Sequence, residues 1–236
     1  MLKTMLLVIF TLGLFSGCDK KNPSSQKAET SQLYTIVSQE VHDSEKYSQY
    51  RANIKKEFQK HGGKLIREFT TLGKPIGVIP YGAANKVLLI GWDSPNGFKD
   101  FLNDPEYKKY KHLVLESVRN LKIMSGKAIH LNIAKPGEIY VLKISNYKAT
   151  DGKAQKIANE INNRLEGLYG LYKEIVIKPN TTKGIERADD VALFYYKKAV
   201  SQKELYKNKK IMKEIGDFNK TYLDSFVYLV LKPVLH

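Results

Sequence analysis

From Leu33 onward the sequence alternates between strand-like and helix-like patterns, and the same order of patterns occurs twice. Runs rich in β-branched and aromatic residues favour strands, whereas apolar residues spaced three and four apart favour a helix. In the first unit, Tyr47, Tyr50, Ile54 and Phe58 have the helical spacing, and Gly62-Gly63 is a typical helix end. The expected elements are a strand over 33–41, a helix from 44 to these glycines, strands over 64–71 and 86–92, helical residues over 96–115, and a strand over 119–124.

The order β-α-β-β-α-β returns in the second half of the chain and is that of the ferredoxin-like motif. Its expected elements are strands over 138–145, 171–178, 190–196 and 226–231 and helices over 151–168 and 201–222. Two open sheets of this kind bury their faces by pairing with each other. We therefore predict an α+β fold in which two tandem ferredoxin-like repeats, residues 33–126 and a degenerate 127–236, form a fused, pseudo-dimeric α/β barrel. One chain would then supply both half-barrels, so a monomer is expected to be self-sufficient.

Residues 1–17 have the three-part form of a secretory signal peptide: a Lys, an apolar run and two small residues before Cys18. The segment from Leu14 to Cys18 resembles the lipobox of bacterial lipoproteins, in which the cysteine is acylated. The alternatives are an incidental thiol and a transmembrane helix, but the apolar run is shorter than the roughly 20 residues that span a bilayer. We predict a signal peptide over 1–17 and lipidation of Cys18.

Residues 18–32 are polar, with almost no bulky apolar side chains, and we predict a flexible tether there. The chain is thus expected to be an exported lipoprotein that binds a cell-envelope membrane through Cys18. Asp19 resembles the signal that keeps some lipoproteins in the inner membrane, which favours its periplasmic face. Cys18 is the only cysteine, so no disulfide framework is expected.

The formal net charge of +15 invites a nucleic-acid hypothesis, which we reject. The positive residues are mostly Lys, whereas bidentate recognition of phosphates and bases favours Arg. They are also spread over both halves rather than gathered in one stripe. A basic face near anionic lipid is an alternative to a solvated, lysine-rich surface, and the solvated surface is favoured.

Four short segments in the first unit resemble a known family. They are Tyr47-Ser-Gln-Tyr50, His61-Gly-Gly63, Trp92-Asp-Ser94 and Asp104-Pro-Glu-Tyr107. Residues 33–126 are similar through them to the domain of unknown function 1330 family, within the dimeric α/β-barrel superfamily. The resemblance implies the fold, and the family has no established activity. The superfamily also holds cofactor-free monooxygenases and haem-degrading enzymes, and a fold alone does not choose among activities.

We predict a membrane-anchored module that binds a small, partly apolar ligand in the first repeat. Apolar pockets with a few polar groups are the usual form of ligand sites. The candidate ligand-binding residues are Tyr47, Tyr50, His61, Trp92, Phe101 and Tyr107. For Trp92 a core position is the alternative, and for His61 a structural role at the helix end, where a cation suits the helix dipole.

The catalytic residues of an enzyme stay unknown, with His61 and His112 as weak candidates for the general base of a cofactor-free monooxygenase or isomerase. The first strand has no Asn and His112 lies too far from Trp92 for a haem-degrading site. His42, His130 and His236 have no metal-ligand spacing, and no phosphate loop or dinucleotide fingerprint occurs, so neither metal nor cofactor is expected. A third possibility is a protein-interaction scaffold, which a large exposed apolar patch on 127–236 would favour.

Overall fold

The computed structural model describes residues 33–133, 135–186 and 188–235. The predicted signal peptide, Cys18, Asp19 and the tether lie outside these residues, so the lipoprotein interpretation stays a prediction. Within the described ranges, no helix is both long and apolar enough to cross a membrane. Residues Ser31–His236 form one compact unit that contains every strand pairing described below.

The first half of this unit contains seven of the described elements, in an order close to the predicted one. They are β1 (Leu33–Val41), α1 (Ser44–Lys60), β2 (Gly63–Gly77), β3 (Lys86–Trp92), α2 (Gly97–Asn103), α3 (Pro105–Ser117) and β4 (Val118–Leu131). The Asp43 side chain caps α1 by accepting from the Lys46 N–H. Asp104 caps α3, and Pro105 occupies the first helical position, where its missing N–H costs nothing.

The second half repeats the order. Its elements are β5 (Ile139–Tyr147), α4 (Lys153–Tyr169), β6 (Leu171–Lys183), β7 (Asp190–Tyr196), α5 (Ala199–Lys207), α6 (Lys209–Tyr222) and β8 (Leu223–Pro233). The predicted helix over 201–222 is interrupted at Asn208, whose side chain accepts from the Ile211 N–H and so begins α6. Asn favours such a cap over a helix interior because its side chain competes for backbone groups.

In the described part of the chain, eight antiparallel strands close into a barrel in the order β1-β3-β2-β8-β5-β7-β6-β4. The α+β class and the barrel are therefore confirmed. The strand order is β4-β1-β3-β2 within the first half and β8-β5-β7-β6 within the second. The halves join where β2 pairs with β8 and β4 pairs with β6.

Both long strands of the first half run past their predicted ends. β2 reaches Gly77 rather than 71, and β4 reaches Leu131 rather than 124. Most of the added residues pair with the second half, Ile76 with Tyr228 and His130 with Val176 among them. A local sequence pattern does not contain this information, since Tyr228 lies 152 positions from Ile76 and Val176 lies 46 positions from His130.

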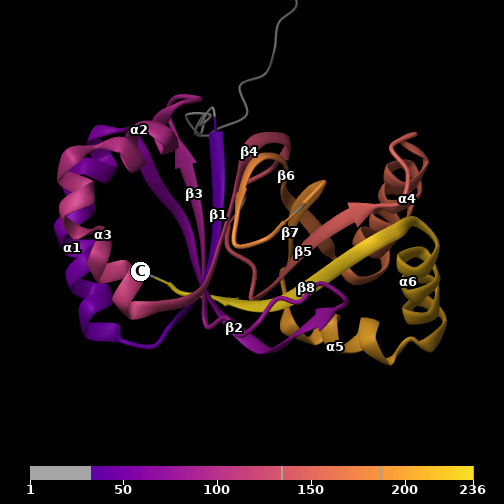
Figure 1. Ribbon diagram of the computed structural model, residues 1–236. Helices are drawn as coiled ribbons and strands as arrows, with labels where there is room; N and C mark the ends of the chain where they lie inside the picture. Colours follow the sequence, from indigo (N-terminus) through magenta and orange to yellow (C-terminus); the bar gives the residue numbers. More distant parts are fainter. Residues whose placement is uncertain (1–32, 134, 187, 236) are drawn as a thin grey trace, which may run out of the picture. The chain divides into compact units, whose positions relative to one another are not determined.

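The two faces of the sheet bury different cores. Alternate residues such as Ile36, Leu142 and Ile144 point into the barrel and form its apolar interior. The outer face of the first half packs under α1, α2 and α3, and that of the second half under α4, α5 and α6 (Figure 1). The barrel is thus a filled core, and the space between sheet and helices remains for a site on each half.

Candidate ligand-binding cavity

A cavity of about 780 Å³ lies between the outer face of the first-half sheet and helices α1–α3; we call it the N-terminal cavity. Five of the six predicted ligand-binding residues line it, namely Tyr47, Tyr50, Trp92, Phe101 and Tyr107. Tyr47 and Tyr50 project from α1 and Trp92 from the end of β3. Phe101 and Tyr107 come from the two helices on either side of Asp104.

The aromatic rings form a continuous row along the wall. The ring centroids of Tyr47 and Tyr50 lie 6.2 Å apart, those of Tyr50 and Tyr107 6.5 Å, and those of Tyr107 and Phe101 4.4 Å. Phe101 continues the row to Trp92 at 5.7 Å. These spacings and tilted geometries are those of favourable aromatic pairs. The row is both a packed layer and an apolar surface for a flat ligand.

Trp92 is fixed by polar groups on the sheet. Its side chain is 1% exposed, and its indole N–H donates to Thr35 Oγ1 at 3.0 Å. The Thr35 hydroxyl in turn forms a hydrogen bond with the Ser125 hydroxyl at 2.8 Å. Gly97 packs against the indole, since a Cβ there would lie 3.2 Å from Trp92 Cε3 and 2.8 Å from the His61 carbonyl oxygen. Trp92 therefore has its donor satisfied and presents only ring surface to the cavity.

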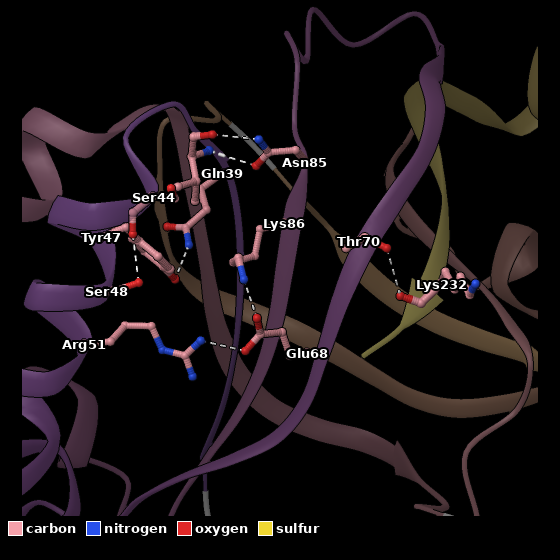
Figure 2. A network of polar contacts seen from close by, with 11 residues as sticks. Gln39, Ser44, Tyr47, Ser48, Arg51, Glu68, Thr70, Asn85, Lys86 and Lys232 are labelled. Carbon is pink, nitrogen blue, oxygen red and sulfur yellow. Dashed lines mark hydrogen bonds and ion pairs between the residues drawn. The ribbon is translucent and has the colours of Figure 1, made fainter. Parts of the chain in front are cut away.

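A charged network of Arg51, Glu68 and Lys86 includes one residue of the cavity wall, Arg51 (Figure 2). Arg51 on α1 lines the cavity and its Nη1 lies 2.7 Å from Glu68 Oε2, while Lys86 on β3 bonds the other carboxylate oxygen. The Glu68 side chain is only 4% exposed. Burial raises its pKa, but the bonds from Lys86 and Arg51 outweigh burial and lower the pKa below its ordinary value. Glu68 is thus a buried carboxylate that two cations keep ionised.

The two tyrosines on α1 are neutral hydroxyls in this setting. Gln39 donates to the Tyr47 hydroxyl, and burial raises the pKa of Tyr47 to about 12. Burial and the neighbouring Tyr107 raise the pKa of Tyr50 well above its usual value. Neither phenol is a base near neutral pH, but both can form hydrogen bonds as neutral groups.

His61 is not among the residues that line the cavity. It caps the end of α1, and its Nε2 lies 2.8 Å from Asp104 Oδ2, which also receives Lys60 Nζ at 2.8 Å. These two bonds, Lys60 first, hold the pKa of Asp104 well below its usual range. The cluster links the end of α1 to the start of α3, the structural role considered for His61.

The other predicted histidines are not brought together. His112 is exposed on α3, with its Nδ1 2.9 Å from the Lys109 carbonyl oxygen, and it does not line the cavity. His42 is exposed and His130 contacts the Lys173 carbonyl oxygen on the barrel, whereas His236 lies outside the described residues. Among the residues that the structure describes, no group of three or more His, Cys, Asp or Glu is placed to hold a metal ion.

Sequence reasoning missed the polar residues Gln39, Arg51, Glu68 and Lys86. One signal was present for Arg51, which follows Tyr47 by four residues and so shares its helix face. Glu68 and Lys86 face each other only because β2 and β3 pair in this register, with Thr70 opposite Lys86 and Glu68 opposite Leu88.

The large exposed apolar side chains of residues 127–236 are spread over several elements. Ile129 is on β4, Leu168 on α4, Val200 and Tyr206 on α5, and Leu235 follows β8. Single exposed apolar residues are common on monomeric proteins. Their distribution gives the scaffold alternative no specific surface.

Comparison with protein-family models finds a match over residues 32–126 to the family described as "Domain of unknown function (DUF1330)". This confirms the resemblance predicted for residues 33–126. No curated protein matches the sequence.

Solved structures share the fold at low sequence identity. An anthrone oxidase-like protein is 13% identical with a TM-score of 0.57, covering 88% of this chain and 93% of the other. A monooxygenase-like protein from Fusobacterium nucleatum is 12% identical with a TM-score of 0.51, covering 87% and 94%. A mutant chlorite dismutase from Candidatus Nitrospira defluvii is 9% identical with a TM-score of 0.57, covering 87% and 92%. At these identities the likeness concerns the dimeric α/β-barrel fold alone.

Proposed function

We propose that this chain, whose residues 32–126 form a DUF1330 domain, binds a small, partly apolar molecule in the N-terminal cavity while acylated Cys18 holds it at a cell-envelope membrane. The observation that carries the proposal is the cavity itself, with a row of aromatic rings and the guanidinium of Arg51 in its wall. A volume of about 780 Å³ falls within the roughly 300–1,000 Å³ of small-molecule sites.

The wall chemistry favours a flat ligand with one polar edge. Tyr50, Phe101 and Tyr107 offer ring faces and edges, and Trp92 offers no free donor because its N–H bonds Thr35. Arg51 uses Nη1 on Glu68, and a guanidinium has five N–H donors in all. A ligand carbonyl or hydroxyl group near Arg51 and the Tyr47 hydroxyl, with its apolar part along the rings, would satisfy both surfaces.

The shared strand order of the two halves supports a tandem duplication. We regard residues 33–126 and 127–236 as ferredoxin-like repeats, the second degenerate, that form a pseudo-dimeric barrel in one chain. Because β2–β8 and β4–β6 pairing replaces a contact between two subunits, a monomer would be self-sufficient.

The enzyme alternative, a cofactor-free monooxygenase or isomerase, draws on the names of the anthrone oxidase-like and monooxygenase-like neighbours. A general base within reach of the ligand is what such chemistry requires. His61 is bonded to Asp104 and His112 is on the exposed face of α3, so neither supports this reading. Binding without turnover fits the cavity better.

Trp92 makes the proposal testable, because it is the only tryptophan in the chain and lines the N-terminal cavity. Titration with planar aromatic alcohols and ketones, 1-naphthol first, should quench or shift its fluorescence in a saturable way. Arg51→Gln should weaken binding of these compounds about fivefold, whereas Arg164→Gln, an exposed arginine on α4, should leave it unchanged. Mass spectrometry of protein purified from its own cells should find a retained small molecule.

If no compound changes Trp92 fluorescence and no molecule is retained, the cavity is not a binding site. The anchor is tested separately: Cys18→Ala should move the protein out of the membrane fraction with its circular dichroism unchanged. Membrane association that survives this substitution would exclude acylation as the anchor.

A further inference from the structure

The second half carries a lysine in an unusual position. Lys143 lies in the middle of β5, opposite Ala192 of β7 and Tyr228 of β8. It belongs to the face that packs under the helices, and its side chain runs beneath α6 with Nζ 5.4 Å from the Phe218 ring centroid. The residue is only 9% exposed. Lysine is almost never buried to this extent without a partner for its charge.

Lys143 lines a cavity of about 330 Å³ between the second-half sheet and helices α4–α6; we call it the C-terminal cavity. The walls are mostly apolar, with Val141, Ile161, Leu165, Phe194, Met212 and Phe218 among the lining residues. Ile76 and Tyr206 also line it and are 60% and 47% exposed, so the cavity opens to solvent beside them.

No described residue forms an ion pair or a hydrogen bond with Lys143 Nζ. Asp190 is the carboxylate whose charge acts on it, but Asp190 accepts from the Ser145 and Tyr147 hydroxyls. The second polar group nearby, Asn219, accepts from the Tyr228 hydroxyl at 3.0 Å. Burial, reinforced by Lys173 on β6, lowers the pKa of Lys143. The cavity thus holds one basic nitrogen, and the polar groups near it, Asp190 and Asn219, already form hydrogen bonds with other side chains.

The barrel does not need a lysine here. Leu33 of β1 and Ile139 of β5 occupy equivalent register positions, each opposite the last residue of the neighbouring strand, Trp92 or Tyr196. Four residues further along, β1 has Val37 and β5 has Lys143. Val37 borders the N-terminal cavity as Lys143 borders the C-terminal one. The amine is therefore a feature of this cavity rather than of the fold.

We propose that the C-terminal cavity binds a small apolar monocarboxylic acid, with its carboxylate on Lys143 Nζ and its hydrocarbon part against the apolar wall. A buried cation costs free energy unless it is paired, and a ligand carboxylate provides the missing charge and acceptors. At about 30 Å³ for each water-sized group, 330 Å³ has room for about eleven heavy atoms. A saturated acid of about eight carbons fits this volume.

The test uses octanoate as the probe and residues 31–236, the compact unit that contains the whole barrel. Methyl-labelled methionine reports the site directly: Met212 lines the C-terminal cavity, whereas Met124 is in the barrel interior. Octanoate should shift the Met212 methyl resonance in a saturable way and leave Met124 and the fluorescence of Trp92 unchanged. 1-Octanol, which has the same chain and no charge, should bind at least tenfold more weakly.

The variant Lys143→Met should weaken octanoate binding at least tenfold and leave octanol binding unchanged. Lys173→Met is the matched control, since Lys173 is on β6 of the same half-sheet and its Nζ bonds Asn159, and this variant should bind octanoate within twofold of the wild type. Calorimetry supplies the affinities, and Lys143→Gln is a second variant should Lys143→Met fail to fold.

Equal affinities for octanoate and octanol in the wild type would overturn the proposal, as would octanoate binding that survives loss of Lys143. A response of Trp92 rather than Met212 would place the acid in the N-terminal cavity and would also overturn it. The two proposals are therefore tested by separate reporters, Met212 for the C-terminal cavity and Trp92 for the N-terminal cavity.

Discussion

The two cavities lie on equivalent faces of one barrel but differ in how they treat charge. Beside the N-terminal cavity, the buried carboxylate of Glu68 is bonded by Arg51, which lines the cavity, and by Lys86; both cations reach solvent, so the charge is compensated within the protein. In the C-terminal cavity Lys143 has no such partner among the described residues, and its walls are mainly apolar. The first cavity is also the larger, at about 780 against 330 Å³.

This difference teaches that the barrel specifies where cavities form and single residues specify what they can hold. Val37 and Lys143 occupy the same register position, and exchanging one side chain changes an apolar wall into a basic one. Fold likeness to oxidases and dismutases therefore says little about either site. The following predictions break or sharpen the comparison, beginning with the largest effect.

The walls of both cavities are also parts of the hydrophobic core, so truncating a large wall residue in either cavity should destabilise the fold to a similar extent. Trp92→Ala removes contacts with Phe58, Phe98 and Phe101, and Tyr196→Ala removes the residue in the equivalent position of β7. Each should lower the free energy of unfolding by about 3–5 kcal/mol, as large aromatic truncations do.

Urea denaturation followed by circular dichroism measures both changes, since Trp92→Ala removes the fluorescent reporter. Leu115→Ala is the control, because Leu115 is 58% exposed on α3 and should change the free energy of unfolding by only about 0.5 kcal/mol. A cost below about 1 kcal/mol for Trp92→Ala would mean that the aromatic row is not a packed layer.

Substitutions at the two equivalent positions, Val37 and Lys143, should change the free energy of unfolding in opposite directions. Lys143→Met removes an unpaired buried charge and should raise the free energy of unfolding by about 1–3 kcal/mol, the cost of an unsatisfied buried polar group. Val37→Lys should lower it by a similar amount. Urea denaturation at pH 7 without ligand gives both values. Destabilisation by Lys143→Met would mean that the amine is compensated in the folded protein.

The destabilisation of the folded protein by Lys143 should depend on pH. Burial lowers its pKa in the folded protein below the ordinary 10.5, so between the two values the unfolded chain binds more protons. Asp190 opposes this shift and Lys173 reinforces it. The advantage of Lys143→Met over the wild type should therefore be largest below the folded pKa and shrink as pH rises toward 10.5. A constant difference between pH 7 and 10 would contradict the assigned cause.

Much of the fold follows from local sequence, and what does not follow depends on distant pairing. The helical spacing of Tyr47 and Tyr50 and the Asp104-Pro105 start of α3 place their helices and direct the aromatic residues toward the sheet. The extensions of β2 and β4 form only because the other half of the barrel pairs with them. No local pattern encodes that partner.

The same division applies to the sites. The aromatic row was predictable because ring size and helix spacing act locally, whereas the Arg51–Glu68–Lys86 network depends on strand register. Lys143 did leave a signal, since it interrupts the apolar run from Ile139 to Ile144. His61 is predicted as a polar group of the ligand site, but its imidazole bonds Asp104 at the end of α1.

His61→Ala should have the smallest effect and decides whether the N-terminal cavity includes this residue. Lys60 keeps its bond to Asp104 when the imidazole is lost, so the free energy of unfolding should fall by only about 1 kcal/mol, the value of one hydrogen bond. Binding of 1-naphthol, followed through Trp92, should change less than twofold, in contrast to Arg51→Gln. A tenfold loss of affinity with unchanged stability would mean that His61 contacts the ligand, so that the N-terminal cavity would use two basic side chains, His61 and Arg51, where the C-terminal cavity uses only Lys143.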